Sequence, residues 1–158
     1  WQSLFLEPSG KIIIAGYRIR GVGHDDFIEY VYSLVLWRFN DDGTLDTTFN
    51  GMGYVVYDDP RGKYASAWGN DVAMDPSGSI FVLGGCNNGI FGYTDMEIWK
   101  YTPEGVLDTT FNGVGYITYN HDAEGKGRDD GFSVVVDVFG RVLVAGRRQN
   151  YSDLSWNS

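Results

Sequence analysis

The string LDTTFNG stands at residues 45–51 and again, letter for letter, at residues 107–113, and it constrains the fold more than any other feature. The two copies lie 62 residues apart, and so do Trp37 and Trp99. A second motif occurs three times, as EPSGKIIIAG at 7–16, DPSGSIFVLGG at 75–85 and DVFGRVLVAG at 137–146. Several landmarks with one period indicate a repeat architecture, in which each copy contributes one supersecondary unit.

The spacing of the repeats predicts where one copy is longer than the others. Gly10, Gly78 and Gly140, the turn glycines of the second motif, are spaced by 68 and then by 62 residues. We expect the six extra residues to form a loop insertion within RIRGVGHDDFIEY. The chain then divides into repeat 1 (1–68), repeat 2 (69–130) and a partial repeat 3 (131–158).

Each repeat contains four segments with the pattern of short β-strands. The first is QSLFL, with NDVAM and FSVVV as counterparts, and a glycine turn leads to KIIIAGY, SIFVLGG or RVLVAGR. Their continuous apolar run predicts a strand that is buried on both faces. The third strand is SLVLWRF or DMEIWKY, in which we expect the basic residue (Arg38 or Lys100) to extend to solvent, and GYVVY or GYITY is the fourth.

Four strands in a unit of about sixty residues are typical of a β-propeller blade. The 22 glycines and the 16% aromatic content favour the same all-β class. The sequence therefore predicts four-stranded antiparallel blades, about two and a half repeats of them, forming a partial propeller. Because propellers close with about four to eight blades, we expect the partners to be other blades of the same protein or further copies of the chain.

The motifs resemble the delta-60 repeat, a β-propeller-associated repeat of bacterial surface and secreted proteins. The resemblance covers nearly the whole chain and is strongest in RFNDDGTLDTTFNGMG and KYTPEGVLDTTFNGVG. It implies a propeller fold and an extracellular or cell-surface location. It implies no general catalytic activity.

Composition excludes some classes of function. The net charge is −9 and the pI is about 4.5, so a nucleic-acid backbone would be repelled. The sequence has no apolar run of 18 residues, and we expect no membrane insertion. Cys86 is the one cysteine, which excludes a disulfide framework within the chain and is expected to be a small, partly buried residue.

The repeated LDTTFNG string is interpreted as a structural turn. Asp46 and Asp108 precede a single helical turn and are expected to cap it by accepting hydrogen bonds from the backbone two or three residues later. Leucine and phenylalanine, four residues apart, would anchor the turn in the core. A catalytic role is disfavoured, because one substrate needs one site.

An acidic loop raises the alternative of a calcium site. The pattern N-x-D-x-E-G at 120–125 resembles the start of an oxygen-ligand loop, in which ligands occupy alternate residues. The competing interpretation is a solvated loop on an acidic protein. No other cofactor is expected, and the candidate calcium ligands are Asn120, Asp122, Glu124, Asp129 and Asp130.

Aromatic residues that differ between copies are candidates for ligand binding. Trp37, Trp99, Phe49 and Phe111 recur at equivalent positions and are expected in the core between blades. The variable ones are expected in or beside loops, where binding residues concentrate, and they suit sugars or protein partners. These candidates are Tyr17, Tyr30, Trp68, Phe91 and Tyr93.

Catalytic motifs are sparse. There is no G-x-S-x-G elbow for a nucleophile. Asp95 and Glu97 break the repeat and form either a glycosidase-like carboxylate pair or, in the simpler interpretation, a solvated strand edge. The leading hypothesis is a non-catalytic structural or interaction module of a bacterial cell-surface or secreted protein. The alternatives are a carbohydrate-binding or carbohydrate-active propeller and a calcium-stabilised adhesion module.

Overall fold

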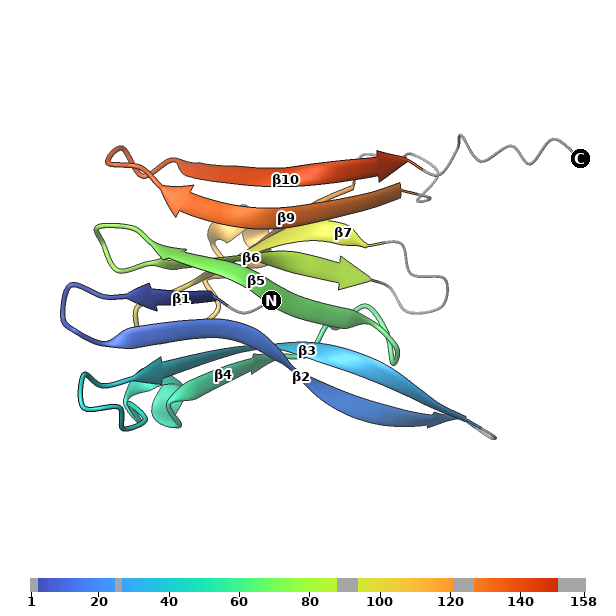
Figure 1. The fold of residues 1–158 in the computed structure, drawn as a ribbon, viewed down its shortest axis with the longest axis horizontal. Coiled ribbons are helices and arrows are strands. Elements are labelled where there is room, and N and C mark those ends of the chain that lie inside the picture. Colours follow the sequence, from blue (N-terminus) through green and yellow to red (C-terminus); the bar gives the residue numbers. More distant parts are fainter. Residues whose placement is uncertain (1–2, 25–26, 88–93, 121–126, 151–158) are drawn as a thin grey trace, which may run out of the picture.

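The strands of the chain form three antiparallel sheets. The computed structural model describes residues 3–24, 27–87, 94–120 and 127–150. The first sheet has the order β1 (Ser3–Leu6), β2 (Ile12–His24), β3 (Phe27–Phe39) and β4 (Tyr54–Tyr57). The second has β5 (Ser66–Met74), β6 (Ile80–Asn87), β7 (Asp95–Tyr101) and β8 (Tyr116–Tyr119), and the third pairs β9 (Gly127–Val136) with β10 (Val142–Asn150). The predicted all-β, four-stranded antiparallel blades are confirmed (Figure 1).

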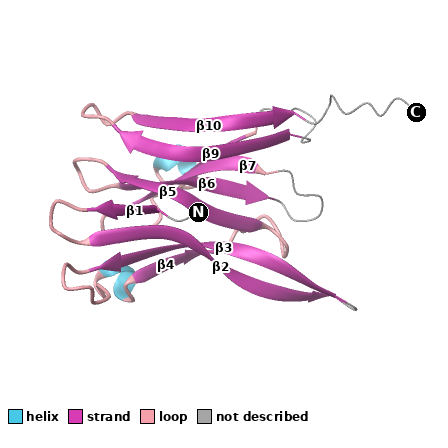
Figure 2. Cartoon of the chain, in the orientation of Figure 1, coloured by secondary structure: helices cyan, strands magenta, loops and turns pink. Residues whose placement is uncertain are grey.

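Regular structure other than strands is limited to two short turns in the described residues. Figure 2 shows them as the 3₁₀ turns η1 (Phe49–Gly51) and η2 (Phe111–Gly113), which lie between the third and fourth strand of each four-stranded sheet. In the same part of the chain, no helix has the length and apolar character needed to span a membrane.

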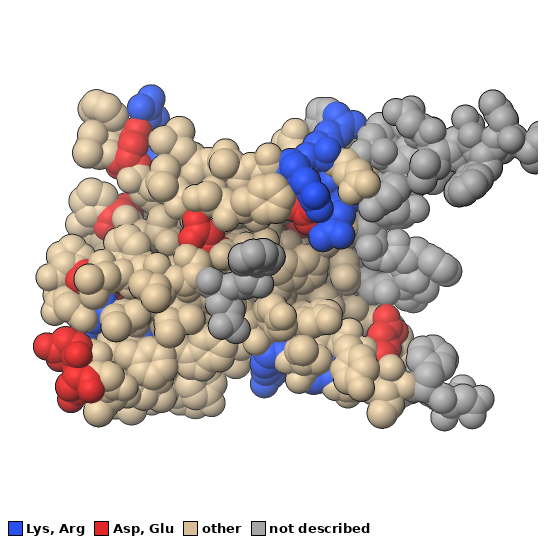
Figure 3. Space-filling view, in the orientation of Figure 1, with Lys and Arg blue, Asp and Glu red and all other residues tan. Residues whose placement is uncertain are grey.

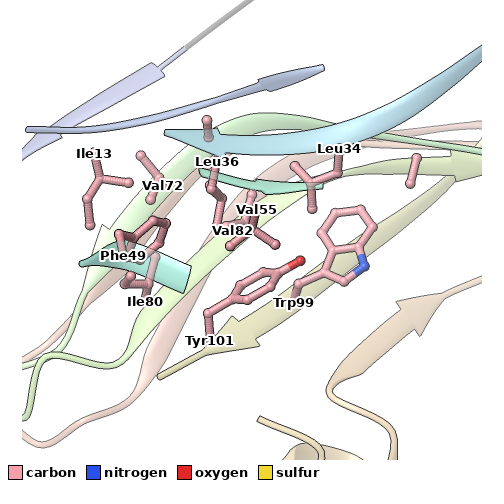
Figure 4. Packing of buried hydrophobic residues seen from close by; sticks show 12 residues of the cluster. Ile13, Leu34, Leu36, Phe49, Val55, Val72, Ile80, Val82, Trp99 and Tyr101 are labelled. Carbon is pink, nitrogen blue, oxygen red and sulfur yellow. The ribbon is translucent and has the colours of Figure 1, made fainter. Parts of the chain in front are cut away.

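The three sheets stack face to face, with hydrophobic clusters between them. The larger cluster lies between the first two sheets, where Leu34 and Leu36 of β3 face Trp99 and Tyr101 of β7 (Figure 4). A smaller cluster between the second and third sheets contains Leu83 and members of β9 and β10. The alternation of side chains explains this stacking, because β3 turns one face to the second sheet, whereas β7 in the middle sheet turns one face to the first sheet and the other to the third.

The middle sheet has both faces covered. All residues from Ile80 to Cys86 in β6 are buried, as the continuous apolar run predicts. In β10 the alternation differs, because Leu143 is 49% exposed whereas Val142 and Val144 pack against the smaller cluster. The open face of the third sheet therefore leaves apolar side chains uncovered by described residues.

The repeat boundaries predicted after residues 68 and 130 fall inside β5 and β9. The second sheet begins at Ser66 and the third at Gly127. The division of the sequence into repeats stays a prediction. The second and third sheets begin a few residues before the predicted repeat boundaries.

The expected loop insertion is a lengthened hairpin, so that prediction is wrong. β2 and β3 pair without interruption from Ile12–Phe39 to His24–Phe27. β-branched and aromatic residues continue the two-residue alternation on both strands, which favours strand over loop. Two of the candidate ligand-binding residues, Tyr17 and Tyr30, consequently lie in strands.

The basic residue at the end of the third strand does not extend to solvent in the first sheet. Arg38 is only 8% exposed. Its Nε donates to Asp46 Oδ2 at 2.7 Å, and its guanidinium group stacks on Phe49, 4.6 Å from the centre of the ring. Its counterpart, Lys100, binds Asp108 at 2.8 Å. The LDTTFNG carboxylate neutralises the basic side chain in both sheets, a pairing that the strand pattern alone does not predict.

The first LDTTFNG turn also joins the two sheets. Phe49 is fully buried, and a Cβ added at Gly105 would lie 2.7 Å from its ring. The backbone N–H of Asn50 donates to Glu104 O at 2.7 Å, and Arg38 donates to Pro103 O at 2.6 Å. In η2, Phe111 is only partly buried, since the described residues contain no third-sheet counterpart of the Pro103–Gly105 turn that covers Phe49.

Candidate functional site

A hollow of about 910 Å³ opens where the first strands of the three sheets meet. β1, β5 and β9 lie next to one another in Figure 1, each leading its own sheet. The lining combines aromatic, amide, hydroxyl and charged side chains, a mixture found in ligand pockets. The lining residues are Ser3, Tyr17, Tyr32, Trp68, Asn70, Asp71, Asn87, Arg128, Asp130, Phe132, Ser133 and Arg147.

Two equivalent β-bulges aim side chains into this hollow. The β5–β6 register shifts between Gly69 and Asp71, which leaves Asn70 unpaired. The β9–β10 register shifts at the equivalent place and leaves Phe132 unpaired. A bulge re-aims the extra residue and bends its strand, and bulges are frequent beside functional sites. Both bulged residues line the hollow.

The bulges depend on glycine in the opposing strand. A Cβ at Gly84 would lie 1.8 Å from the carbonyl oxygen of Trp68, and one at Gly146 would lie 2.4 Å from that of Asp130. Neither distance is compatible with a side chain, because heavy atoms at such separations overlap. Gly84 and Gly146 therefore allow the two paired strands to approach closely enough to form the bulges.

Hydrogen bonds between the first strands fix the floor of the hollow. Asp71 is central, since its Oδ1 accepts from Ser3 Oγ at 2.6 Å and its Oδ2 accepts from Val134 N at 2.8 Å. Asn70 Nδ2 donates to Gly131 O at 2.9 Å. The Asp71 carboxylate thus links all three sheets, and hydrogen-bond donors from the protein occupy both of its oxygens.

Aromatic side chains form one wall. The rings of Tyr17 and Tyr32 meet edge to face at 5.2 Å between centroids, and Tyr32 meets Trp68 in the same way at 6.3 Å. Phe132 lies in the adjoining lining and is 54% exposed. An edge-to-face contact uses the edge of one ring and one face of the other, so each contact leaves at least one face of each ring outside it.

Two arginines and one aspartate form the opposite side. Asp130, 9% exposed, accepts from Arg128 Nε at 2.9 Å and from Arg147 Nε at 2.8 Å. The Arg147 guanidinium lies 5.7 Å from the centre of the Phe132 ring. Figure 3 shows basic side chains gathered at the end of the third sheet beside an acidic one.

The predicted ligand-binding aromatics divide into three groups. Tyr17 and Trp68 line the hollow, although both lie in strands rather than loops. Tyr30 is 65% exposed on the lengthened hairpin and does not line it. Phe91 and Tyr93 lie outside the described residues.

Sequence reasoning gave no ligand-binding role to most of the other lining residues. Asn70, Phe132 and Ser133 were interpreted only as members of first strands. Arg147 was interpreted only as the end of a second strand, Asp130 only as a calcium ligand, and Arg128 was not considered. One signal was available: a glycine precedes NDVAM and FSVVV, and another glycine ends the facing apolar run. Glycine within a strand marks a bulge or a close backbone approach.

The calcium hypothesis stays a prediction, because Asp122 and Glu124 lie outside the described residues. Asp129 and Asp130 are consecutive in β9, so their side chains point to opposite faces. Asp130 is engaged by the two arginines. Within the described ranges, no three His, Cys, Asp or Glu side chains form a group suited to a metal ion.

The predicted caps form the hydrogen bonds of an Asx turn. Asp46 Oδ1 accepts from Thr48 N at 3.1 Å, and Asp108 Oδ1 accepts from Thr110 N at 3.1 Å. The N-cap residues of the two 3₁₀ turns are Thr48 and Thr110. The aspartates lie two residues before these N-caps. Lys100 and Thr110 hold the pKa of Asp108 down to about 2 through their hydrogen bonds.

The expectation of a solvated edge at Glu97 is wrong. This carboxylate is 0% exposed and faces the core between the first two sheets, where Arg61 donates to it at 2.8 Å. Arg61 also binds Asp59, which is 5% exposed, and Thr118 Oγ1 donates to Glu97 Oε2 at 2.9 Å. Arg61 comes from the segment between β4 and β5, so the strand pattern of β7 gives no sign of it.

Two neighbours of Glu97 are also shielded from solvent, since Asp95 is half-buried and Cys86 is fully buried. Burial raises the pKa of Asp95 and of the Cys86 thiol above their usual values. Cys86 is a free, fully buried cysteine in β6 rather than a partly buried one. A thiol held in its neutral form and a carboxylate locked in an ion pair are poorly suited to nucleophilic or acid–base catalysis.

Comparison with known families agrees with this geometry. The model of a family described as "Domain of unknown function (DUF5122) beta-propeller" matches residues 7–49 and 76–111, half of the chain. Both matched segments run from the hairpin of the first and second strands to the phenylalanine of the LDTTFNG turn. The chain therefore belongs to this β-propeller family, and its sheets are blades. A search among curated proteins finds no match.

Proposed function

We propose that this chain is an interaction module, made of delta-60-type β-propeller repeats, within a larger bacterial cell-surface or secreted protein. Its partners are the neighbouring blades and a carbohydrate that binds in the hollow between the first strands. The single observation that carries the proposal is the hollow itself, where equivalent bulges on successive blades aim Asn70 and Phe132 at one space.

The chemistry of the lining favours carbohydrate over the broader class of protein partners. Sugar rings present C–H faces that stack on aromatic rings, and hydroxyl groups that pair with amides, carboxylates and guanidinium groups. The hollow offers Tyr17, Tyr32 and Trp68 for the first purpose. Asn87 offers an amide oxygen that is buried and has no hydrogen-bond partner in the described residues. A carbohydrate-cleaving role is disfavoured, since Glu97 is locked in the core with Arg61.

A glycan array tests this function. We expect the wild-type chain to bind a defined set of glycans, and Phe132→Ala and Tyr17→Ala to weaken that binding about tenfold, the usual scale for losing an aromatic contact. Tyr30→Ala is the matched control, because Tyr30 is an exposed aromatic outside the hollow. Absence of glycan binding, or an equal loss in the control, would overturn the proposal.

A further inference from the structure

We propose that the saccharide recognised by the hollow is acidic, carrying a carboxylate or sulfate group that binds the guanidinium groups of Arg128 and Arg147. This inference rests on the proposed carbohydrate function and adds the charge of the ligand. The main observation in its support is that one buried carboxylate, Asp130, orients both arginines at the wall of the hollow.

The two guanidinium groups retain capacity for a ligand. Asp130 accepts from the Nε atom of each arginine, at 2.9 Å and 2.8 Å. Within the described ranges, the terminal nitrogens of Arg128 and Arg147 have no hydrogen-bond partner. Each guanidinium therefore presents its terminal donors, which suit the two oxygens of a carboxylate or sulfate.

The local charge favours an anion even though the whole chain is acidic. Two positive charges face one negative charge at this wall, which leaves an excess of one positive charge. The other carboxylate of the lining, Asp71, lies on the floor and is occupied by Ser3 and by the backbone N–H groups of Val72 and Val134. An anionic group would thus meet oriented donors instead of a competing carboxylate.

The position of the arginines next to an aromatic ring fits a substituted sugar. The Arg147 guanidinium lies 5.7 Å from the centre of the Phe132 ring, which the bulge in β9 places in the hollow. A sugar stacked on the aromatic side would have an acidic substituent within reach of the basic side. Arg128 is 44% and Arg147 is 55% exposed, so an incoming ligand can reach both side chains.

Titration calorimetry with three probes tests the inference: trigalacturonate, a sulfated galactose trisaccharide, and neutral galactotriose. We expect at least one acidic probe to bind about tenfold or more tightly than the neutral one, the usual scale for a charge-assisted hydrogen bond. Arg147→Gln and Arg128→Gln should each remove most of this preference and leave the affinity for galactotriose unchanged. Added salt should weaken the binding of the acidic probe.

Arg18→Gln provides the matched control. Arg18 is 48% exposed and paired with Asp58, as the hollow arginines are paired with Asp130, but it does not line the hollow. Equal affinity for acidic and neutral probes would overturn the inference while the proposed carbohydrate function stands. The inference would also be overturned if none of the three probes binds, or if Arg18→Gln reduces the preference for the acidic probe as much as Arg128→Gln and Arg147→Gln do. The glycan array tests the broader carbohydrate function separately.

Discussion

Arg61 is the residue whose loss we expect to cost most stability. Its side chain binds the buried carboxylates Asp59 and Glu97, and its removal would leave both charges without a cation. Breaking a buried ion pair from one side costs about 3–5 kcal/mol, because an uncompensated charge stays in the core. Arg61→Ala should lower the free energy of unfolding by that amount in urea denaturation.

The control for this prediction is Arg18→Ala. Arg18 and Asp58 are both about half exposed, at 48% and 51%, so solvent screens their attraction. Surface pairs of this kind contribute about 0–1 kcal/mol. Similar losses in the two variants would show that Glu97 is not buried as described.

Acid should destabilise the chain partly through Asp46. Burial alone would raise the pKa of this carboxyl, but hydrogen bonds from Lys11 and Thr48 and the charge of Arg38 hold it far below its usual value. A lowered folded-state pKa contributes stability that is present above the unfolded pKa, about 4, and is lost as the pH falls.

Thermal unfolding at several pH values checks this effect. Asp46→Asn should lower the melting temperature at pH 7 and reduce the further loss of stability between about pH 4 and pH 2, since it removes the titrating group. An unchanged slope of melting temperature against pH in the variant would contradict the role assigned to the Lys11–Asp46–Arg38 cluster.

At the scale of elements, the periodic pattern predicts the strands well, but it does not predict the lengthened β2–β3 hairpin or the bulges in β5 and β9. The 62-residue period and the alternation in SLVLWRF place four strands per sheet correctly, because burial on stacked faces produces that alternation. The extension of the β2–β3 hairpin is not predicted, because the spacing of the turn glycines reveals six extra residues but not whether they form a loop or longer strands. The candidate site was only partly predictable, because the bulges and Asp130 pairing depend on neighbouring strands.

The bulge in β5 gives a prediction for a single glycine. Gly84→Ala would place a Cβ 1.8 Å from the Trp68 carbonyl oxygen, so the strands must separate or lose their register. Overpacking of this kind costs about 1–3 kcal/mol or more. Urea denaturation should show that loss, whereas Gly23→Ala should show little change, because its Cβ meets no atom within 4 Å.

At the scale of the whole molecule, the stack of blades has an apolar face that no described residue covers. Val135 and Leu143 lie opposite each other in the β9–β10 register and are 53% and 49% exposed. In a propeller, a further blade covers such a face. The described residues form two four-stranded blades and one two-stranded sheet, so we expect isolated chains to associate through this face.

Sedimentation velocity tests that expectation. The wild-type chain should sediment faster as its concentration rises, and Leu143→Lys should shift it toward monomer because a charge resists burial between sheets. Val106→Lys is the control, since Val106 is 55% exposed but lies in the turn between β7 and η2. A concentration-independent monomer for the wild-type chain would oppose this prediction.

The central claim is that ligand binding belongs to the hollow between the first strands and not to the repeated LDTTFNG turn. The most direct measurement is calorimetric titration of the glycan selected by the array into the wild-type chain, Phe132→Ala and Asp108→Asn. We expect Asp108→Asn to bind like the wild-type chain and Phe132→Ala to bind about tenfold more weakly. Loss of binding in Asp108→Asn, with full binding in Phe132→Ala, would contradict the account.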